Sequence, residues 1–223
     1  MKKIVFAAFS MFLLGAGSAT AQTADTQDHQ WQFRLRGLGV VPNESASISA
    51  IGGDVDISNA LVPELDITYY FTKHIAVELI LGTTKHDVNT VASDLAPIGG
   101  GITDVDLGSV RLLPPTLTAQ YHFYPTESIK PYVGAGINYT LFYDVDPGKV
   151  VKDVEYENAF GFAFQVGSDF FFNDNFFVNL DAKYIMLKTD VTVNASNLAP
   201  DLSIPAEVTI NPLLLGIGIG YRF

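Results

Sequence analysis

The sequence predicts an all-β fold, an eight-stranded antiparallel transmembrane β-barrel with short periplasmic turns and long extracellular loops. Eight segments of the 223-residue chain alternate between large apolar residues and small or polar ones, which is the two-residue period of a β-strand. The connections between these segments are alternately short and long. Several segments carry charged residues on one face, and a charged face cannot contact lipid. The apolar faces are therefore predicted to point outward, opposite to a soluble lipocalin-like barrel.

The first residues are predicted to be a cleaved signal peptide rather than part of the fold. Lys2 and Lys3 precede a short apolar run, and small residues end in Ala19-Thr20-Ala21. A basic start, a short apolar core and an A-x-A site are typical of secretory export. We predict a signal peptide over 1–21 and a single barrel domain over 22–223.

The composition excludes several classes of protein. The formal net charge is −11 and no cluster of Lys and Arg is present, which argues against nucleic-acid binding. The chain has no Cys, so no disulfide stabilises the exported fold. No run after the signal peptide approaches the ~18 apolar residues of a membrane helix.

Eight strands are expected, and their order justifies the barrel. They run over about 31–41, 61–71, 75–82, 111–123 and 131–143, then through Phe160–Phe170, Val178–Met186 and 210–223. The first three carry inner-face charges, and the fifth and sixth place large apolar residues opposite small ones. The last strand alternates large apolar residues with Gly216, Gly218 and Gly220, which leave room inside a narrow barrel. Long loops rich in polar residues are expected at 43–59, 86–110, 144–157 and 189–207.

With a periplasmic N-terminus, each inward residue acquires a depth. An apolar funnel is predicted at the outer end, formed by Leu38, Val40, Val62, Ile80, Leu112, Phe142 and Leu214. An ionic floor is predicted below it, formed by Arg34, Arg36, Glu64, Asp66, Glu78, Asp181, Lys183 and Arg222. Opposite charges on neighbouring strands can pair across the sheet. The alternative is that the apolar set is ordinary packing, because side chains can fill an eight-stranded barrel.

Four prolines near the outer ends of strands suggest a lateral gap in the barrel wall. They are Pro63, Pro114, Pro115 and Pro212. Proline removes a donor from the hydrogen-bond ladder, and a closed barrel has no edge strand to tolerate that loss. We hypothesise that a hydrophobic molecule leaves the funnel through this gap into lipid. The alternative is that the prolines only end strands where loops begin.

Other chemistry is not expected. His29, His74, His86 and His122 are scattered without metal-ligand spacing, so no metal site is predicted. His122 has no convincing Ser partner, and neither an enzyme activity nor a cofactor is expected.

The chain resembles the outer-membrane protein W (OmpW) family, which includes alkane-uptake relatives. The resemblance rests on Leu113-Pro114-Pro115-Thr116-Leu117-Thr118, on Pro131-Tyr132-Val133-Gly134-Ala135-Gly136, on Asp181-Ala182-Lys183-Tyr184 and on the ending Gly218-Ile219-Gly220-Tyr221-Arg222-Phe223. One departure is Leu213, where the family often has an aromatic residue. Membership implies an eight-stranded barrel with an apolar lumen that passes small hydrophobic molecules.

We therefore expect a Gram-negative outer-membrane channel for small hydrophobic solutes, surrounded by outer-membrane lipid. The carboxy-terminal Phe223 resembles the signal by which the barrel assembly machinery recognises its clients. The alternative is a structural or adhesive barrel with a blocked lumen that works through its extracellular loops.

Overall fold

A computed structural model describes residues 30–48, 51–96, 100–124, 126–197 and 200–223. The predicted signal peptide, 1–21, lies outside these residues. Within the described ranges, no helix is long and apolar enough to cross a membrane.

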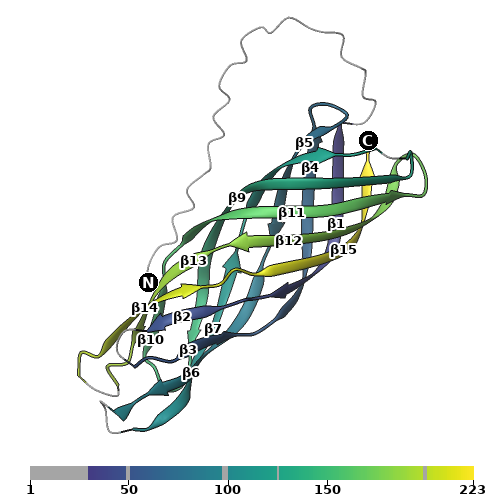
Figure 1. Ribbon diagram of the computed structural model, residues 1–223. Helices are drawn as coiled ribbons and strands as arrows, with labels where there is room; N and C mark the ends of the chain where they lie inside the picture. The colour runs from purple at the N-terminus through teal and green to yellow at the C-terminus, as the bar shows by residue number, and fades with distance from the viewer. Residues whose placement is uncertain (1–29, 49–50, 97–99, 125, 198–199) are drawn as a thin grey trace, which may run out of the picture.

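Eight antiparallel strands close into a barrel, as predicted (Figure 1). In spatial order the strands are β1 (Trp31–Val41), β4 (Ala60–Tyr70), β5 (Ile75–Gly82), β8 (Thr116–His122), β9 (Ile129–Pro147), β11 (Ala159–Phe171), β12 (Phe176–Met186) and β15 (Leu213–Arg222). The first and last strands meet along their whole length, from Gln32 opposite Arg222 to Val41 opposite Leu213. This closure leaves no free edge in the membrane-spanning wall.

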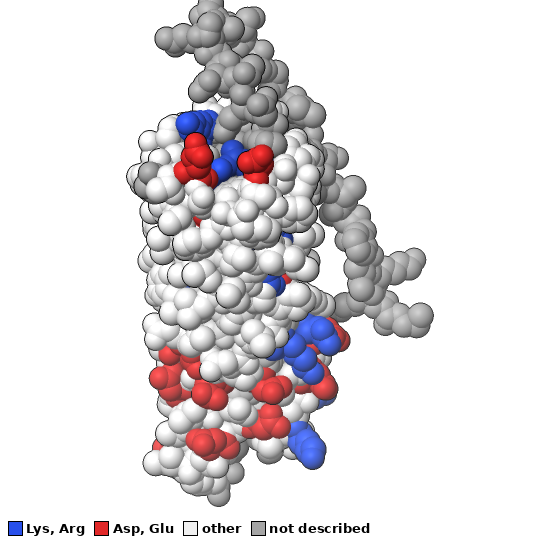
Figure 2. Space-filling model, turned by 90° about the vertical axis from the view of Figure 1, so that its right-hand side faces the viewer, with Lys and Arg blue, Asp and Glu red and all other residues white. Residues whose placement is uncertain are grey.

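The period-two pattern sets which side chains enter the barrel. On β15, Leu214 is buried, whereas Leu213 and Leu215 on either side of it are exposed. Outward-facing apolar and aromatic residues make a broad, almost uncharged band around the molecule, with charged residues at its two ends (Figure 2). This is the surface that a lipid bilayer requires.

The outer end of the barrel extends further as two groups of strands, a separate four-stranded sheet and a three-stranded continuation of the barrel sheet (Figure 1). They contain β2 (Ser45–Ile48), β3 (Asp54–Ile57), β6 (Thr84–Asp94), β7 (Ile102–Leu113), β10 (Asp153–Tyr156), β13 (Lys188–Asn194) and β14 (Ser203–Thr209). One sheet has the order β10-β13-β14-β2, and β3, β6 and β7 continue from β9.

The prediction that 43–59, 86–110, 144–157 and 189–207 are loops is therefore wrong for much of their length. On β13, Val191 and Val193 are buried while Asp190 and Thr192 are exposed. Buried and exposed residues alternate along these strands, but the exposed face is polar because it contacts water rather than lipid. That polar face makes the composition look like that of a loop.

The predicted strand over 111–123 is also wrong in its continuity. Pro114 and Pro115 separate β7 from β8. Strand β8 pairs with β5 as far as Ile80 opposite Thr116, and pairing resumes between β6 and β7 at Thr84 opposite Leu112. Proline cannot donate to a ladder, which accounts for the interruption.

Candidate functional site

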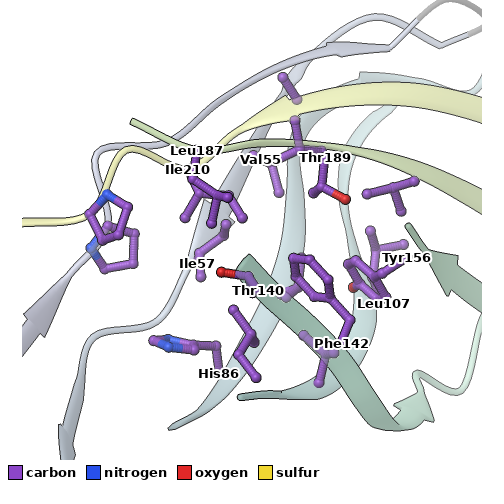
Figure 3. A pocket seen from close by; sticks show the side chains of 18 of the residues that line it. Val55, Ile57, His86, Leu107, Thr140, Phe142, Tyr156, Leu187, Thr189 and Ile210 are labelled. Atoms are coloured by element: carbon purple, nitrogen blue, oxygen red, sulfur yellow. The ribbon is translucent and has the colours of Figure 1, made fainter. Parts of the chain in front are cut away.

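An apolar cavity of about 180 Å³ occupies the outer half of the barrel (Figure 3). All seven residues of the predicted apolar funnel line it, namely Leu38, Val40, Val62, Ile80, Leu112, Phe142 and Leu214. They come from β1, β4, β5, β7, β9 and β15, and alternation turns each of them inward. The structure thus brings together side chains that are far apart in the sequence.

The extension supplies a second tier of cavity wall that the loop prediction missed. Its inward residues include Val55, Val88, Val105, Leu107, Val151, Val191, Val193, Ile204 and Val208. Two features of the sequence could have identified this tier. Val191 and Val193 are separated by one polar residue, and Val88 stands between the polar residues Asp87 and Asn89. The cavity is therefore deeper than the membrane-spanning barrel alone would make it.

The base of the cavity is formed by the predicted ionic floor. Glu64 and Lys183 line the cavity from below. Arg36 contacts two carboxylates of the neighbouring strand β4: its Nε donates to Glu64 at 2.9 Å and its Nη2 to Asp66 at 2.6 Å. The ion pair with Asp181, at 3.3 Å, comes from β12, two strands away on the other side of β1. The guanidinium therefore links β4 and β12 across the inner face of β1 and β15.

Arg34 makes a second set of crossings one layer further toward the periplasm. It pairs with Glu78 on β5, and its Nη2 lies 3.3 Å from Asp169 on β11. Both Arg34 and Arg36 are buried, and such charges are tolerated only with partners. Lys183 completes the floor, with Nζ 3.6 Å from Glu64 and 3.8 Å from Asp181.

Neutral side chains that were not predicted as part of the floor complete its hydrogen bonds. Gln165 on β11 donates to both Glu78 and Asp181 at 2.8 Å. Asn179 accepts from Arg36 at 3.1 Å and donates to Asp169 at 2.7 Å. Because buried carboxylates need several donors, these amides stabilise the charged layer.

Aromatic rings fill the barrel below the ionic floor. Tyr70, Tyr132 and Phe177 are buried there with His122. Arg222 was predicted to belong to the floor, but it lies among these rings. Its guanidinium sits 3.9 Å from the centre of the Tyr70 ring and donates to the hydroxyl of Tyr124 at 3.4 Å. The described lumen thus changes from apolar to ionic to aromatic toward the periplasm.

Gly220 makes room for one of these rings, and its replacement tests the packing. A Cβ at Gly220 would lie 2.1 Å from the ring of the buried Phe177. We expect Gly220→Ala to reduce the free energy of unfolding by about 1–3 kcal/mol, as overpacking does. Urea titration in lipid vesicles measures it. The control is Gly39→Ala, whose Cβ would meet its nearest atom at 3.7 Å. Equal effects of the two changes would contradict the close packing.

The four predicted prolines have different surroundings. The carbonyl of Pro212 accepts from the Ile185 amide at 3.2 Å, and the Ile210 amide donates to Leu187 at 2.9 Å, so the wall is bridged there. The carbonyl of Pro115 accepts from the Tyr139 amide at 3.1 Å, which joins it to β9. Pro212 therefore lies in a bridged part of the wall, whereas Pro115 is bonded on its β9 side and faces the break between β8 and β7 on its other side.

Pro63 and Pro114 border an interruption. The amide of Tyr70 donates toward β1 and that of Phe71 toward β5, so alternation points the nitrogen of Pro63 toward β5. The amide of His122 donates to His74, so alternation points the nitrogen of Pro114 toward the β5–β6 strand as well. Residues 81–83 are unpaired on the β8 side, and pairing on the β4 side ends at Gly82, so the two missing donors flank Thr83.

Two titratable groups of the cavity wall lie above the membrane band, at the level of the exposed Lys85 and of the Arg111–Asp144 ion pair. Burial lowers the pKa of His86, and this outweighs the hydrogen bond from its ring to the Ser58 carbonyl. Burial raises the pKa of the Tyr156 phenol to about 12. Both side chains are therefore uncharged at neutral pH.

Phe223 lies at the seam where the barrel closes. Its amide donates to the Trp31 carbonyl at 2.9 Å, and its ring stacks on Phe33 with centroids 5.6 Å apart. The predicted role of Phe223 in assembly remains a prediction. Among the described residues, no group of three or more His, Cys, Asp or Glu side chains is placed to hold a metal ion.

Comparisons with known proteins identify the family. The profile of the OmpW family matches residues 27–223. An uncharacterized outer-membrane protein, y4mB, of Sinorhizobium fredii is 43% identical over 194 residues, which cover 86% of this chain and 80% of that protein. Outer membrane protein AlkL of Ectopseudomonas oleovorans is 28% identical over 224 residues, 95% of this chain and 93% of that one.

A solved structure of an outer-membrane protein is similar to this chain. The crystal structure of OprG from Pseudomonas aeruginosa matches with a TM-score of 0.76 and 26% identity, over 87% of this chain and 96% of that one. The described barrel and its outward apolar band are those of an outer-membrane protein, and the relatives are outer-membrane proteins as well. The chain belongs to the OmpW family and is an outer-membrane β-barrel.

Proposed function

We propose that this protein admits small hydrophobic molecules from outside the cell and releases them sideways into the outer membrane. The observation that carries the proposal is the apolar cavity above the ionic floor. An apolar molecule gains by leaving water for the cavity, at about 25 cal/mol per Å² of buried apolar surface. The resemblance to alkane-uptake relatives of the OmpW family supports the same class of solute.

The ionic floor favours a sideways exit over passage to the periplasm. To cross the floor, an apolar molecule would have to separate the contacts of Arg36 with Glu64 and Asp66, which are 2.9 and 2.6 Å long. Separating buried ion pairs without replacing the lost contacts is costly. Lipid, in contrast, offers an apolar environment directly outside the wall.

The exit is proposed around Thr83, between Pro63 and Pro114. Pairing of β4 with β5 ends at Glu64 opposite Gly82, and the next backbone contact is from the Ser58 amide to the Asp87 carbonyl at 3.0 Å. Between these points the wall has no ladder hydrogen bonds in the described structure. Few bonds would have to break for the wall to part there.

Restoring the missing donors tests the exit. We expect Pro63→Val together with Pro114→Val to reduce uptake of a small hydrocarbon such as naphthalene by intact cells several-fold, because new ladder bonds would close the interruption. The matched control is Pro212→Val, in a wall that is already bridged, and it should leave uptake unchanged. Normal uptake by the double variant, with equal amounts of folded protein in the outer membrane, would refute lateral release at this point.

A further inference from the structure

The cavity contains two polar side chains that each keep a hydrogen-bonding group without a partner within the described part of the chain. They are Thr84 and His86, both on β6 and both part of the cavity lining. Thr84 is 8% and His86 5% exposed. Residues two apart on a strand share a face and lie about 6.6 Å apart. The two groups therefore form one polar spot on an apolar wall.

The tautomer of His86 is set by the barrel wall. Its Nδ1 lies 2.6 Å from the backbone carbonyl of Ser58, which can only accept, so Nδ1 carries the proton. In the neutral ring, Nε2 is then an acceptor. Among the described residues Nε2 has no hydrogen-bond partner, and it is not among the fully enclosed polar atoms. This nitrogen is thus available to a molecule in the cavity.

Most other polar side chains of the cavity are already engaged. Thr90 accepts from the Val105 amide, whereas Thr116, Thr140 and Thr189 donate to the Pro114 carbonyl, Asn138 and the Glu157 carbonyl, respectively. Glu64 and Lys183 belong to the ionic floor. The Tyr156 hydroxyl lies on another strand, β10, and its ring stacks on Phe142. Two unused groups side by side distinguish β6 from the rest of the wall.

We propose that Thr84 and His86 form a polar anchor that selects hydrophobic molecules bearing a hydroxyl group. The hydroxyl donates to Nε2 of His86 and can accept from the hydroxyl of Thr84, while the apolar part fills the cavity. This inference rests on the proposed function, because it concerns the solutes that the same cavity admits. The anchor also lies beside the proposed exit, since Thr84 is the first residue of β6 and its pairing with Leu112 is where the ladder resumes on the β7 side.

The anchor requires an uncharged His86. Burial lowers its pKa below the ordinary value of about 6.5, against the raising effects of the Ser58 carbonyl and of the Asp87 and Glu44 carboxylates. At pH 7 the ring is therefore neutral and Nε2 accepts. Below that ordinary value, as the ring takes up a proton, Nε2 becomes a donor and the preference for hydroxyl donors is lost.

The test compares three probes of similar size: naphthalene, 1-naphthol and 1-methoxynaphthalene, which differ in whether they carry a hydroxyl donor. The protein is reconstituted in vesicles whose outer leaflet is lipopolysaccharide, and entry of each probe is measured against protein-free vesicles. We expect wild type to favour 1-naphthol over 1-methoxynaphthalene roughly three- to tenfold at pH 7, the effect of one hydrogen bond. Because the pKa of His86 is lowered, the preference should persist at pH 6.5, where an ordinary histidine is already half protonated, and should fall only at lower pH.

His86→Leu should bring entry of 1-naphthol relative to 1-methoxynaphthalene close to parity, and the preference is judged from this ratio rather than from the rate of naphthalene entry. Tyr156→Phe, which removes another cavity hydroxyl, should retain the preference. His86→Gln keeps both a donor for Ser58 and an acceptor, so it should retain part of the preference and serves if the leucine variant does not fold. A preference that is absent at pH 7, or that survives in folded His86→Leu, overturns the anchor. If naphthalene itself does not enter faster than without protein, the proposed function fails instead.

Discussion

Leu38→Asp and Leu214→Asp are each expected to reduce protein-dependent entry of naphthalene at least tenfold. Both leucines line the cavity and are nearly inaccessible, at 4% and 6% exposure. An aspartate there would either stay charged without a partner or draw water into the cavity, and both outcomes oppose an apolar solute. A loss of about 1.4 kcal/mol of solute binding already corresponds to a tenfold change. Entry into vesicles with a lipopolysaccharide outer leaflet measures the effect.

Leu38→Met is the control for these changes, because it conserves volume and polarity. It should retain entry close to that of wild type. Folding of every variant is checked first by the shift in electrophoretic mobility on heating. Undiminished entry by folded Leu38→Asp and Leu214→Asp would mean that solutes do not pass through the cavity. A barrel that works through its extracellular surface would then be the better interpretation.

Arg36→Met is expected to lower the free energy of unfolding by about 3–5 kcal/mol. The change leaves Glu64, Asp66 and Asp181 near one another in the interior without the cation that contacts all three. Uncompensated buried charge is the physical reason for the large effect. Urea titration of the protein in lipid vesicles measures it.

Arg111→Met provides the matched control for Arg36→Met. Arg111 pairs with Asp144 at 2.9 Å, but the two side chains are 43% and 69% exposed. A solvent-exposed pair contributes about 0–1 kcal/mol, so this variant should remain close to wild type. If both arginine changes have the same small effect, the floor is not held together by the contacts of Arg36.

Much of the cavity could be predicted from the sequence because strand alternation fixes the direction of each side chain. Once the strands were placed, Leu38 and Leu214 could only point inward. The inner face of the extension was missed for a related reason. Its strands are polar on the outside because water surrounds them, so they lack the large outward apolar residues by which membrane strands are recognised. Only inward residues such as Val191 and Val193 indicate that these segments are strands.

The partners within the floor could be predicted only in part. Arg36 and Glu64 lie directly opposite each other on neighbouring strands, and the opposite inward charges of these two strands already suggest such pairing. The contacts of Arg34 with Asp169 and of Gln165 with Glu78 cross the lumen. Such crossings depend on the barrel's width and on the lengths of the side chains, which alternation along single strands does not determine. Arg222 lies in the aromatic layer for another reason, because it is opposite Gln32 near the start of β1 and so lies closer to the periplasm than Arg34.

The measurement that tests the account most directly follows where the solute arrives. Naphthalene is supplied outside vesicles with a lipopolysaccharide outer leaflet, and two quenchers report its arrival, one attached to lipid tails and one dissolved in the vesicle interior. We predict that the protein accelerates arrival in the lipid, and that the interior signal follows only at the rate set by escape from lipid. Direct, protein-dependent arrival in the interior before the lipid signal, or no acceleration of either, would contradict an apolar cavity that discharges sideways above a closed ionic floor.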